Sequence, residues 1–136
     1  MTTDPESSAM SVNDPQTLQS LTVEAERYEV ALMTNDVAAL DAMFWDSERA
    51  VRFGVGENLY GFAQIAAFRV GRPGGSPPRR PLRTSVTTFG HDFGVVNVEF
   101  QRDASVSIGR QSQTWVRFAG VWKIVAAHVS LLGTGH

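Results

Sequence analysis

Residues 82 to 132 read LRTSVTTFGHDFGVVNVEFQRDASVSIGRQSQTWVRFAGVWKIVAAHVSLL, and this stretch decides the fold. It divides into four runs rich in β-branched and aromatic residues, separated by turn-forming residues at positions 90–92, 103–105 and 119–120. Long runs joined by short turns are typical of antiparallel hairpins. Four consecutive strands of this length predict a strongly curved antiparallel sheet.

The half of the chain before this sheet carries three helical patterns. Asp14 followed by Pro15 is typical of a helix start, and apolar residues then recur every three or four positions up to about residue 34. Shorter patterns of the same period predict helices over residues 37–44 and 62–70. Helices that precede the strands in this way indicate an α+β fold, with three helices packed on the curved sheet.

A short strand is expected between the second and third helices. In residues 50–55, Val51, Phe53 and Val55 alternate with small residues and Arg52, so the three apolar side chains are expected to face the core. The residues on the Arg52 side are alanine and glycine, which leave room beside the guanidinium for another group. The alternative is a surface or ion-paired arginine, and the pattern alone does not decide between them.

The chain of 136 residues has the length of one domain. Residues 1–13 are polar without an apolar period and are expected to form a flexible tail, so the domain is predicted to span residues 14–133. Within it, residues 56–61 are expected to form a turn. Residues 71–81, GRPGGSPPRRP, are expected to form a mobile basic loop, because glycine and proline oppose regular structure.

Composition excludes several classes of protein. A net charge of −2 and a pI near 5.9 give no indication of nucleic-acid binding, and no segment resembles a signal peptide or membrane anchor. The sequence contains no cysteine, which fits a cytoplasmic protein. Its three histidines are scattered, with no carboxylate at ligand spacing, so we expect neither a metal nor another cofactor.

Polar groups in otherwise apolar patterns are the candidate site residues. Tyr28 lies on the buried stripe of the first helix, where it is either a core aromatic residue or a hydroxyl donor in a pocket. Residues 111–114, QSQT, place polar groups on both faces of a long strand. His128 alternates with Trp122 and Ile124 and is expected to share their face, either as a satisfied core residue or as a pocket group.

Four blocks of sequence closely resemble the AtzH-like family of the NTF2-like superfamily. They are ERYE at 26–29, VRFGV at 51–55 with ENLYG at 57–61, AFR at 67–69, and GRQSQTWVR at 109–117 with IVAAHVSL at 124–131. The resemblance runs from about residue 20 to Leu132. It implies the NTF2-like (cystatin-like) cone, in which helices pack on a strongly curved antiparallel sheet.

The resemblance also implies an activity. The family's namesake is proposed to be a decarboxylating amidohydrolase that converts dicarboxyurea to allophanate in cyanuric acid breakdown, alongside an amidase. Its proposed catalytic tyrosine and arginine fall on Tyr28 and Arg52. The implied substrate is a small anionic nitrogenous compound in nitrogen catabolism, and the implied enzyme is a metal-independent amidohydrolase acting on a C–N bond.

The chemistry of such a substrate implies roles for the polar residues. Protonating the nitrogen of an N-carboxylated urea releases carbon dioxide without a covalent nucleophile, so Arg52 would clamp a carboxylate and Tyr28 would supply the proton. A doubly charged substrate would need a second cation, for which Arg69 and Arg110 are candidates. Gln113 and His128 are candidates for hydrogen bonds to the urea core.

Two other functions compete with this enzyme. The first is a non-catalytic pocketed partner or assembly subunit for an amidase, and the second is a proton-transfer isomerase with Glu99 as its base. In either case we expect a homodimer formed through the sheet. The second face of the long strands must be covered, and Trp115 or Trp122 would otherwise be exposed.

Overall fold

The computed structural model describes residues 10–133, which form three helices and one six-stranded sheet. The α+β class is confirmed. In chain order the elements are α2 (Pro15–Met33), α3 (Val37–Met43), β1 (Val51–Phe53), β2 (Asn58–Tyr60), α4 (Phe62–Val70), β3 (Arg79–Phe89), β4 (Phe93–Arg102), β5 (Ile108–Phe118) and β6 (Val121–Leu131).

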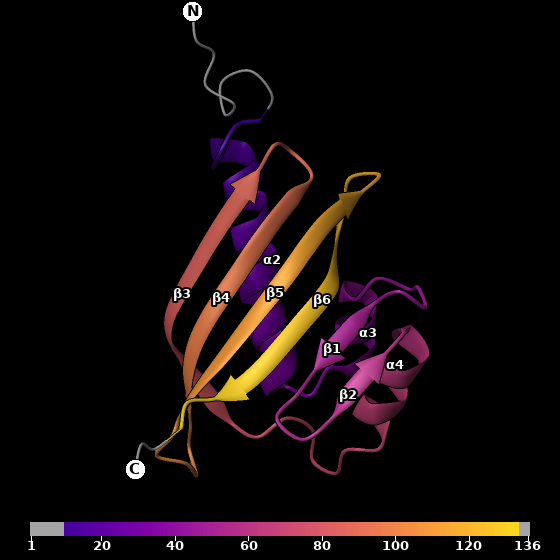
Figure 1. Ribbon diagram of the computed structural model, residues 1–136, viewed down its shortest axis with the longest axis vertical. Helices are drawn as coiled ribbons and strands as arrows, with labels where there is room; N and C mark the ends of the chain where they lie inside the picture. The colour runs from indigo at the N-terminus through magenta and orange to yellow at the C-terminus, as the bar shows by residue number, and fades with distance from the viewer. Residues whose placement is uncertain (1–9, 134–136) are drawn as a thin grey trace, which may run out of the picture.

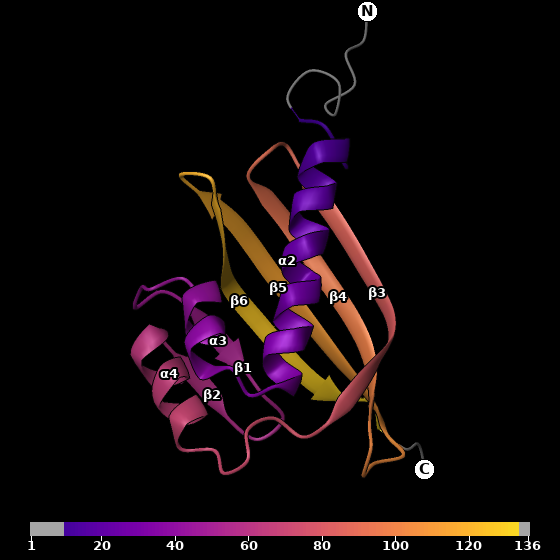
Figure 2. The same ribbon diagram turned by 180° about the vertical axis from the view of Figure 1, so that it is seen from behind.

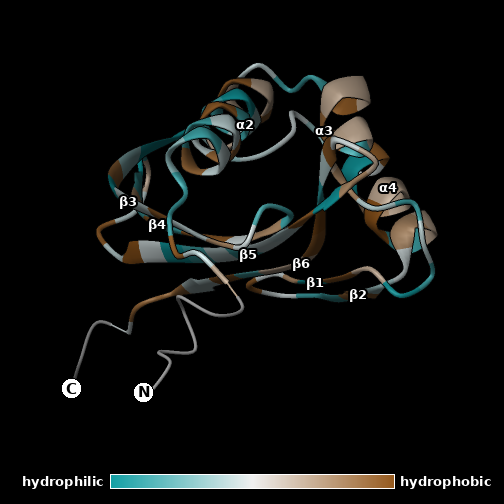
Figure 3. Cartoon of the chain, turned by 90° about the horizontal axis from the view of Figure 1, so that it is seen from above, coloured by the Kyte–Doolittle hydropathy of each residue, from teal (hydrophilic) through white to brown (hydrophobic). Residues whose placement is uncertain are grey.

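The four long strands form consecutive antiparallel pairs, as predicted, and the order across the sheet is β2-β1-β6-β5-β4-β3. β1 differs because it pairs in parallel with β6, and β2, which the sequence assigned to a turn, closes that edge antiparallel to β1. The helices all lie on one side of the sheet: α2 crosses the long strands, and α3 and α4 lie at the β1–β2 end (Figures 1 and 2). The opposite face carries no helix from the described residues (Figure 3).

The core lies between α2 and the inner face of the sheet, the face toward the helices. Alternate residues of β4 and β5 point to it, and they are buried while their neighbours are exposed or half-buried. Trp115 and Trp122 belong to this inner set, at 0% and 5% exposure. The expectation that one of them would be exposed on the outer face is therefore wrong.

A bulge in β6 changes which of its residues face the core. Trp115 pairs with Ile124, but Thr114 pairs with Ala126, so Val125 is the extra residue. The bulge shifts the inward set from Trp122 and Ile124 to Ala127 and Val129, which are all buried. His128 consequently lies exposed on the outer face, and the prediction that it shares a face with Trp122 is wrong.

The inner and outer faces of β1 are opposite to those expected from the sequence. Arg52 pairs with Leu59 and Ala127, both buried, so its side chain lies on the inner face. Val51 and Phe53 lie on the outer face, where the Phe53 ring meets His128 edge-on at 5.7 Å between centroids. The expectation of a core face at Val51 and Phe53 is wrong because this apolar face belongs to the uncovered side of the sheet.

Two segments are more ordered than the sequence predicts. β3 begins at Arg79, inside the expected mobile loop, and this arginine is buried. The expected tail is only partly described, because residues 1–9 lie outside the described range. Residues 11–13 of that tail hydrogen-bond to the end of β3: the Asn13 backbone N–H donates to the Thr88 carbonyl at 3.0 Å, and Gly90 N–H donates to the Ser11 carbonyl at 2.8 Å.

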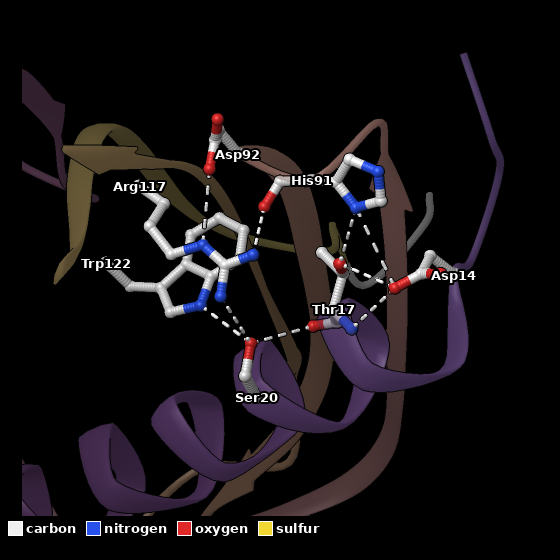
Figure 4. Close-up of polar contacts among 7 residues, drawn as sticks. All are labelled: Asp14, Thr17, Ser20, His91, Asp92, Arg117 and Trp122. Carbon is white, nitrogen blue, oxygen red and sulfur yellow. Dashed lines mark hydrogen bonds and ion pairs between the residues drawn. The ribbon is translucent and has the colours of Figure 1, made fainter. Parts of the chain in front are cut away.

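A polar cluster ties the start of α2 to the far end of the sheet (Figure 4). Asp14 caps the helix by accepting from the Thr17 backbone N–H at 3.1 Å, and its position there follows from the Asp-Pro start. One turn on, the Ser20 hydroxyl accepts from Trp122 Nε1 at 2.9 Å and from Arg117 at 3.3 Å. Arg117 also donates to the carbonyl of His91. The cluster therefore joins the first two turns of α2 to β5 and β6.

Within residues 10–133, no helix has the length and apolar character needed to cross a membrane.

Candidate active site

A small pocket near the β1 end of the sheet is lined by three arginines and Tyr28. The pocket has a volume of about 20 Å³, and the guanidinium-bearing residues are Arg52, Arg69 and Arg72. Apolar side chains from α2 and α4, including Phe68, complete it. The structure therefore places Tyr28 and Arg52 on one pocket, one from the middle of α2 and the other from β1. Sequence spacing alone does not require Tyr28 and Arg52 to meet, because they lie on different secondary-structure elements.

Arg52 is held by a carboxylate from the following turn. Its Nη1 donates to Glu57 Oε2 at 3.1 Å, and its side chain is only 11% exposed. Gly54 makes this pairing possible, because a Cβ there would lie 1.9 Å from Glu57 Oε2. The room that the small residues leave beside Arg52 is thus partly occupied by Glu57 from its own chain.

The other two arginines differ in their pairing. Arg69 Nη1 donates to Asp41 Oδ1 at 2.6 Å and its guanidinium lies over the Phe44 ring, so its charge is balanced. Arg72 stacks on Phe68 with its guanidinium carbon 4.7 Å from the ring centroid, and its side chain makes no hydrogen bond or ion pair with any residue from 10 to 133.

Tyr28 is oriented by a chain of buried hydrogen bonds. Arg79 donates to Glu29 Oε1 at 2.5 Å and to Gln111 Oε1 at 2.7 Å, and its side chain is 4% exposed. Gln111 Nε2 in turn donates to the Tyr28 hydroxyl oxygen at 3.2 Å. Because arginine only donates, it fixes which end of the Gln111 amide faces Tyr28. The Tyr28 oxygen is therefore an acceptor in this chain, and its own proton is left to be donated elsewhere.

A larger cavity lies on the other side of Tyr28, between α2 and strands β3 to β5. It has a volume of about 520 Å³ and is lined mainly by apolar side chains such as Ala25, Val96 and Val98. Tyr28 borders this cavity as well as the arginine pocket. The arginine pocket holds the three guanidinium groups, whereas Glu26 and Glu29 are among the residues that line the larger cavity. The larger cavity supplies the space for a ligand.

Gln113 is the one further predicted site residue that lines the larger cavity. Its Oε1 accepts from Trp115 Nε1 at 2.9 Å, and since an indole only donates, the Gln113 NH₂ group faces away from Trp115. That NH₂ group makes no hydrogen bond within the described part of the chain. It is available to donate to a carbonyl in the cavity.

Three other candidates lie on the opposite face of the sheet. Arg110 and Glu99 are exposed and border a shallow outer groove, and His128 lies on another. The structure does not bring them together with Tyr28. The expectation that Glu99 is on the inner side of the sheet is wrong, because the inward residues of β4 are Val98 and Phe100.

Three residues of the site were missed from the sequence. Arg72 and Arg79 lie in the segment expected to be a loop, and Gln111 was noted only as part of a polar run. A signal existed for Gln111, since Gln111 and Gln113 share the face of Trp115 by strand alternation. No sequence signal separates Arg72 and Arg79 from the other arginines of that segment.

Three helices on one face of a curved sheet, with a pocket between them, are typical of proteins with the cystatin-like or NTF2-like fold. A Salmonella enterica protein of the nuclear transport factor 2-like superfamily shares it, with 20% identity, a TM-score of 0.72, and coverage of 88% of this chain and 94% of its own. At that identity the likeness concerns the fold alone.

Within this class, the model of the AtzH-like family matches residues 10–135, and the chain belongs to that family. A solved protein of unknown function from Pectobacterium atrosepticum is 51% identical, with a TM-score of 0.87 over 90% of this chain and 95% of its own. A cystatin-like fold protein from Burkholderia xenovorans is 43% identical, with a TM-score of 0.88 over 93% and 100%. Among curated proteins, none matches this chain.

Proposed function

We propose that this protein is a metal-independent amidohydrolase that decarboxylates an N-carboxylated urea. The observation that carries the proposal is the position of Tyr28, which lines both the arginine pocket and the larger cavity. A substrate lying across the Tyr28 hydroxyl would place a carboxylate beside Arg52 and its urea core in the larger cavity. Arginine suits this task because its planar guanidinium can bind a carboxylate through two N–H groups.

The reaction needs one proton and no covalent intermediate. Tyr28 donates its hydroxyl proton to the nitrogen that carries the departing carboxylate, the N–CO₂ bond breaks with its electron pair remaining on nitrogen, and carbon dioxide leaves. Two groups support this role for Tyr28. The N–H of Gln111 stabilises the phenolate oxygen left behind, and Gln113 is free to donate to the urea carbonyl. A proton from water then restores the phenol.

The surroundings of the two carboxylates of a dicarboxyurea would differ. The retained carboxylate is held by the arginines, whereas the departing one lies in the larger cavity, which is lined by apolar side chains such as Val96 and Val98 and by the carboxylates of Glu26 and Glu29. Neighbouring carboxylates, like apolar surroundings, disfavour a second negative charge. Loss of carbon dioxide converts that charged group into a neutral molecule, which apolar surroundings favour. The arrangement therefore supports release of one carboxylate and retention of the other, as in conversion of dicarboxyurea to allophanate.

The proposal is tested by incubating the purified protein with freshly generated N-carboxylated ureas, measuring carbon dioxide and ammonia separately. We expect carbon dioxide to be released without ammonia. Arg52→Lys keeps the charge but loses the planar two-point contact, so turnover should fall severely and the substrate should bind less tightly. Arg27→Lys is the matched control, since Arg27 is exposed on α2 and pairs only with Glu24.

Equal rates with and without the protein would contradict the proposal. That result, together with binding of an amidase that survives both substitutions, would instead favour a non-catalytic partner of an amidase.

A further inference from the structure

The arginine pocket carries a charge that its own residues do not balance. Arg52 pairs with Glu57 and Arg69 pairs with Asp41, but Arg72 has no acidic partner among residues 10–133. Three guanidinium groups therefore face two carboxylates, which leaves one positive charge on the pocket. A half-buried cation without a partner is costly, because its loss of hydration is not compensated.

The position of Arg72 is determined by structure on both sides of it. Its backbone N–H donates to the Arg69 carbonyl at the end of α4, and its carbonyl accepts from Gly75 N–H at 3.2 Å. Gly74 and Gly75 have φ values of 73° and 75°, a region that glycine adopts readily, so they form the turn that returns the chain to this point. The guanidinium stacks on the Phe68 ring.

The neighbours of Arg72 are consistent with an electrostatically strained cation. Burial and the charge of Arg52 lower the pKa of Arg72 from its ordinary value, while Glu57 and Tyr28 act in the opposite direction. Tyr28 is thus among the groups close enough to influence Arg72. An anion in the pocket that Arg72 lines would share it with Arg52 and Tyr28.

We infer that Arg72 is the second arm of a carboxylate clamp and that, with Arg52, it binds the carboxylate that the substrate retains. The unbalanced charge matches one carboxylate, and the pocket volume of about 20 Å³ holds about one water molecule, so it has room for one carboxylate oxygen. The rest of the ligand must extend out of the pocket. This assignment replaces Arg69, whose charge Asp41 balances at 2.6 Å, and Arg110, which lies on the outer face. Arg52 is also paired, with Glu57 at 3.1 Å, so the unbalanced charge that an anion meets is that of Arg72. The urea-like ligand and the retained carboxylate rest on the proposed function.

The test is direct binding, measured by calorimetry, of two stable urea-like probes of nearly the same shape. Malonamate carries one carboxylate, and malonamide carries a neutral amide in its place. The wild-type protein should bind malonamate at least tenfold more tightly than malonamide. Arg72→Gln should weaken malonamate binding about 10- to 100-fold and leave malonamide unchanged, because a charge-assisted hydrogen bond is lost. Arg72→Lys should be intermediate.

Arg27→Gln is the matched control, since it removes the same charge from an exposed position. It should bind malonamate like the wild type at constant ionic strength, and thermal unfolding should show that each variant is folded. Arg72→Gln binding malonamate as tightly as the control, or a wild type without preference for malonamate, would overturn the inference. If either of these results is found but the wild type still releases carbon dioxide, the clamp is refuted and the proposed function is not. If Arg72→Gln loses malonamate binding but the wild type shows no turnover, the proposed function is refuted and the clamp is supported.

Discussion

At the scale of single residues, the chemistry of this site depends on what each side chain is already bonded to. Arg52, Arg69 and Arg72 have the same guanidinium, yet two are paired with carboxylates and the third has no such partner among the described residues. Similarly, Gln111 and Gln113 have the same amide, but each is oriented by a neighbour that can only donate. Residue type therefore suggests a role, and the hydrogen-bond partners decide which atom is free to perform it.

Tyr28→Phe tests the proton donor. The substitution removes only the hydroxyl, so the ring keeps its packing and the protein should fold. The Gln111 N–H loses its acceptor, which should lower the free energy of unfolding by about 1–3 kcal/mol. If Tyr28 protonates the departing nitrogen, kcat for carbon dioxide release should fall by about two to four orders of magnitude with little change in substrate binding. Turnover close to that of the wild type would show that the proton comes from another group.

At the scale of elements, the first turn of α2 is stabilised by a charge. Hydrogen bonds from the backbone N–H and then the hydroxyl of Thr17 lower the pKa of Asp14 from its ordinary value of 3.8, with smaller contributions from His91 and Arg117. A carboxyl group whose pKa is lower in the folded state stabilises the fold above its unfolded pKa, and that contribution is lost as the pH falls through the folded pKa.

We therefore expect the wild type to lose stability more steeply than Asp14→Asn on acidification. Asparagine retains an oxygen to cap the helix but has no charge to lose. Urea unfolding midpoints measured from about pH 5 down to about pH 2.5 should converge for the two proteins, with the wild type more stable at the upper end. Parallel curves over this range would mean that the Asp14 charge does not contribute.

At the scale of the whole molecule, the uncovered face of the sheet is the most prominent feature. It carries a groove of about 230 Å³ bordered by Val51, Phe53 and Thr114, and Phe93 and Phe118 are about 40% exposed. Both tryptophans that were expected there face the core, and the face combines these phenylalanines with polar side chains such as Glu99, Arg110 and His128. The exposed phenylalanines and the groove favour contact with a second copy of the chain.

We expect a homodimer through this face, detected by light scattering at micromolar concentration. Thr114→Arg places a long charged side chain in the groove and should give a monomer, while the adjacent Trp115 stays packed in the core. Gln19→Arg adds the same charge to the exposed side of α2 and should leave the dimer intact. A wild type that is monomeric at these concentrations would contradict the prediction.

The sequence by itself determined the order and type of most elements. The helix over residues 15–33 followed from one capping pair and one apolar stripe, and the four long strands followed from their β-branched composition and turns. These signals are local, since they depend on residues within a few positions of each other. The sequence likewise singled out Tyr28 and Arg52, although their catalytic roles stay predictions.

Only the tertiary structure decided which faces are inside and which charges are free. One extra residue in β6 turned His128 toward the outer face. In β1, the side chain that faces the interior is Arg52, and the apolar side chains of Val51 and Phe53 face outward. A bulge depends on register with the neighbouring strand, and burial depends on which side the helices cover; neither is encoded in local periodicity. The pairing of Arg79 with Glu29 joins residues fifty positions apart. Whether Arg72 finds a carboxylate partner within residues 10–133 likewise depends on where the acidic side chains of other elements lie. Long-range packing therefore determined the chemistry of the site.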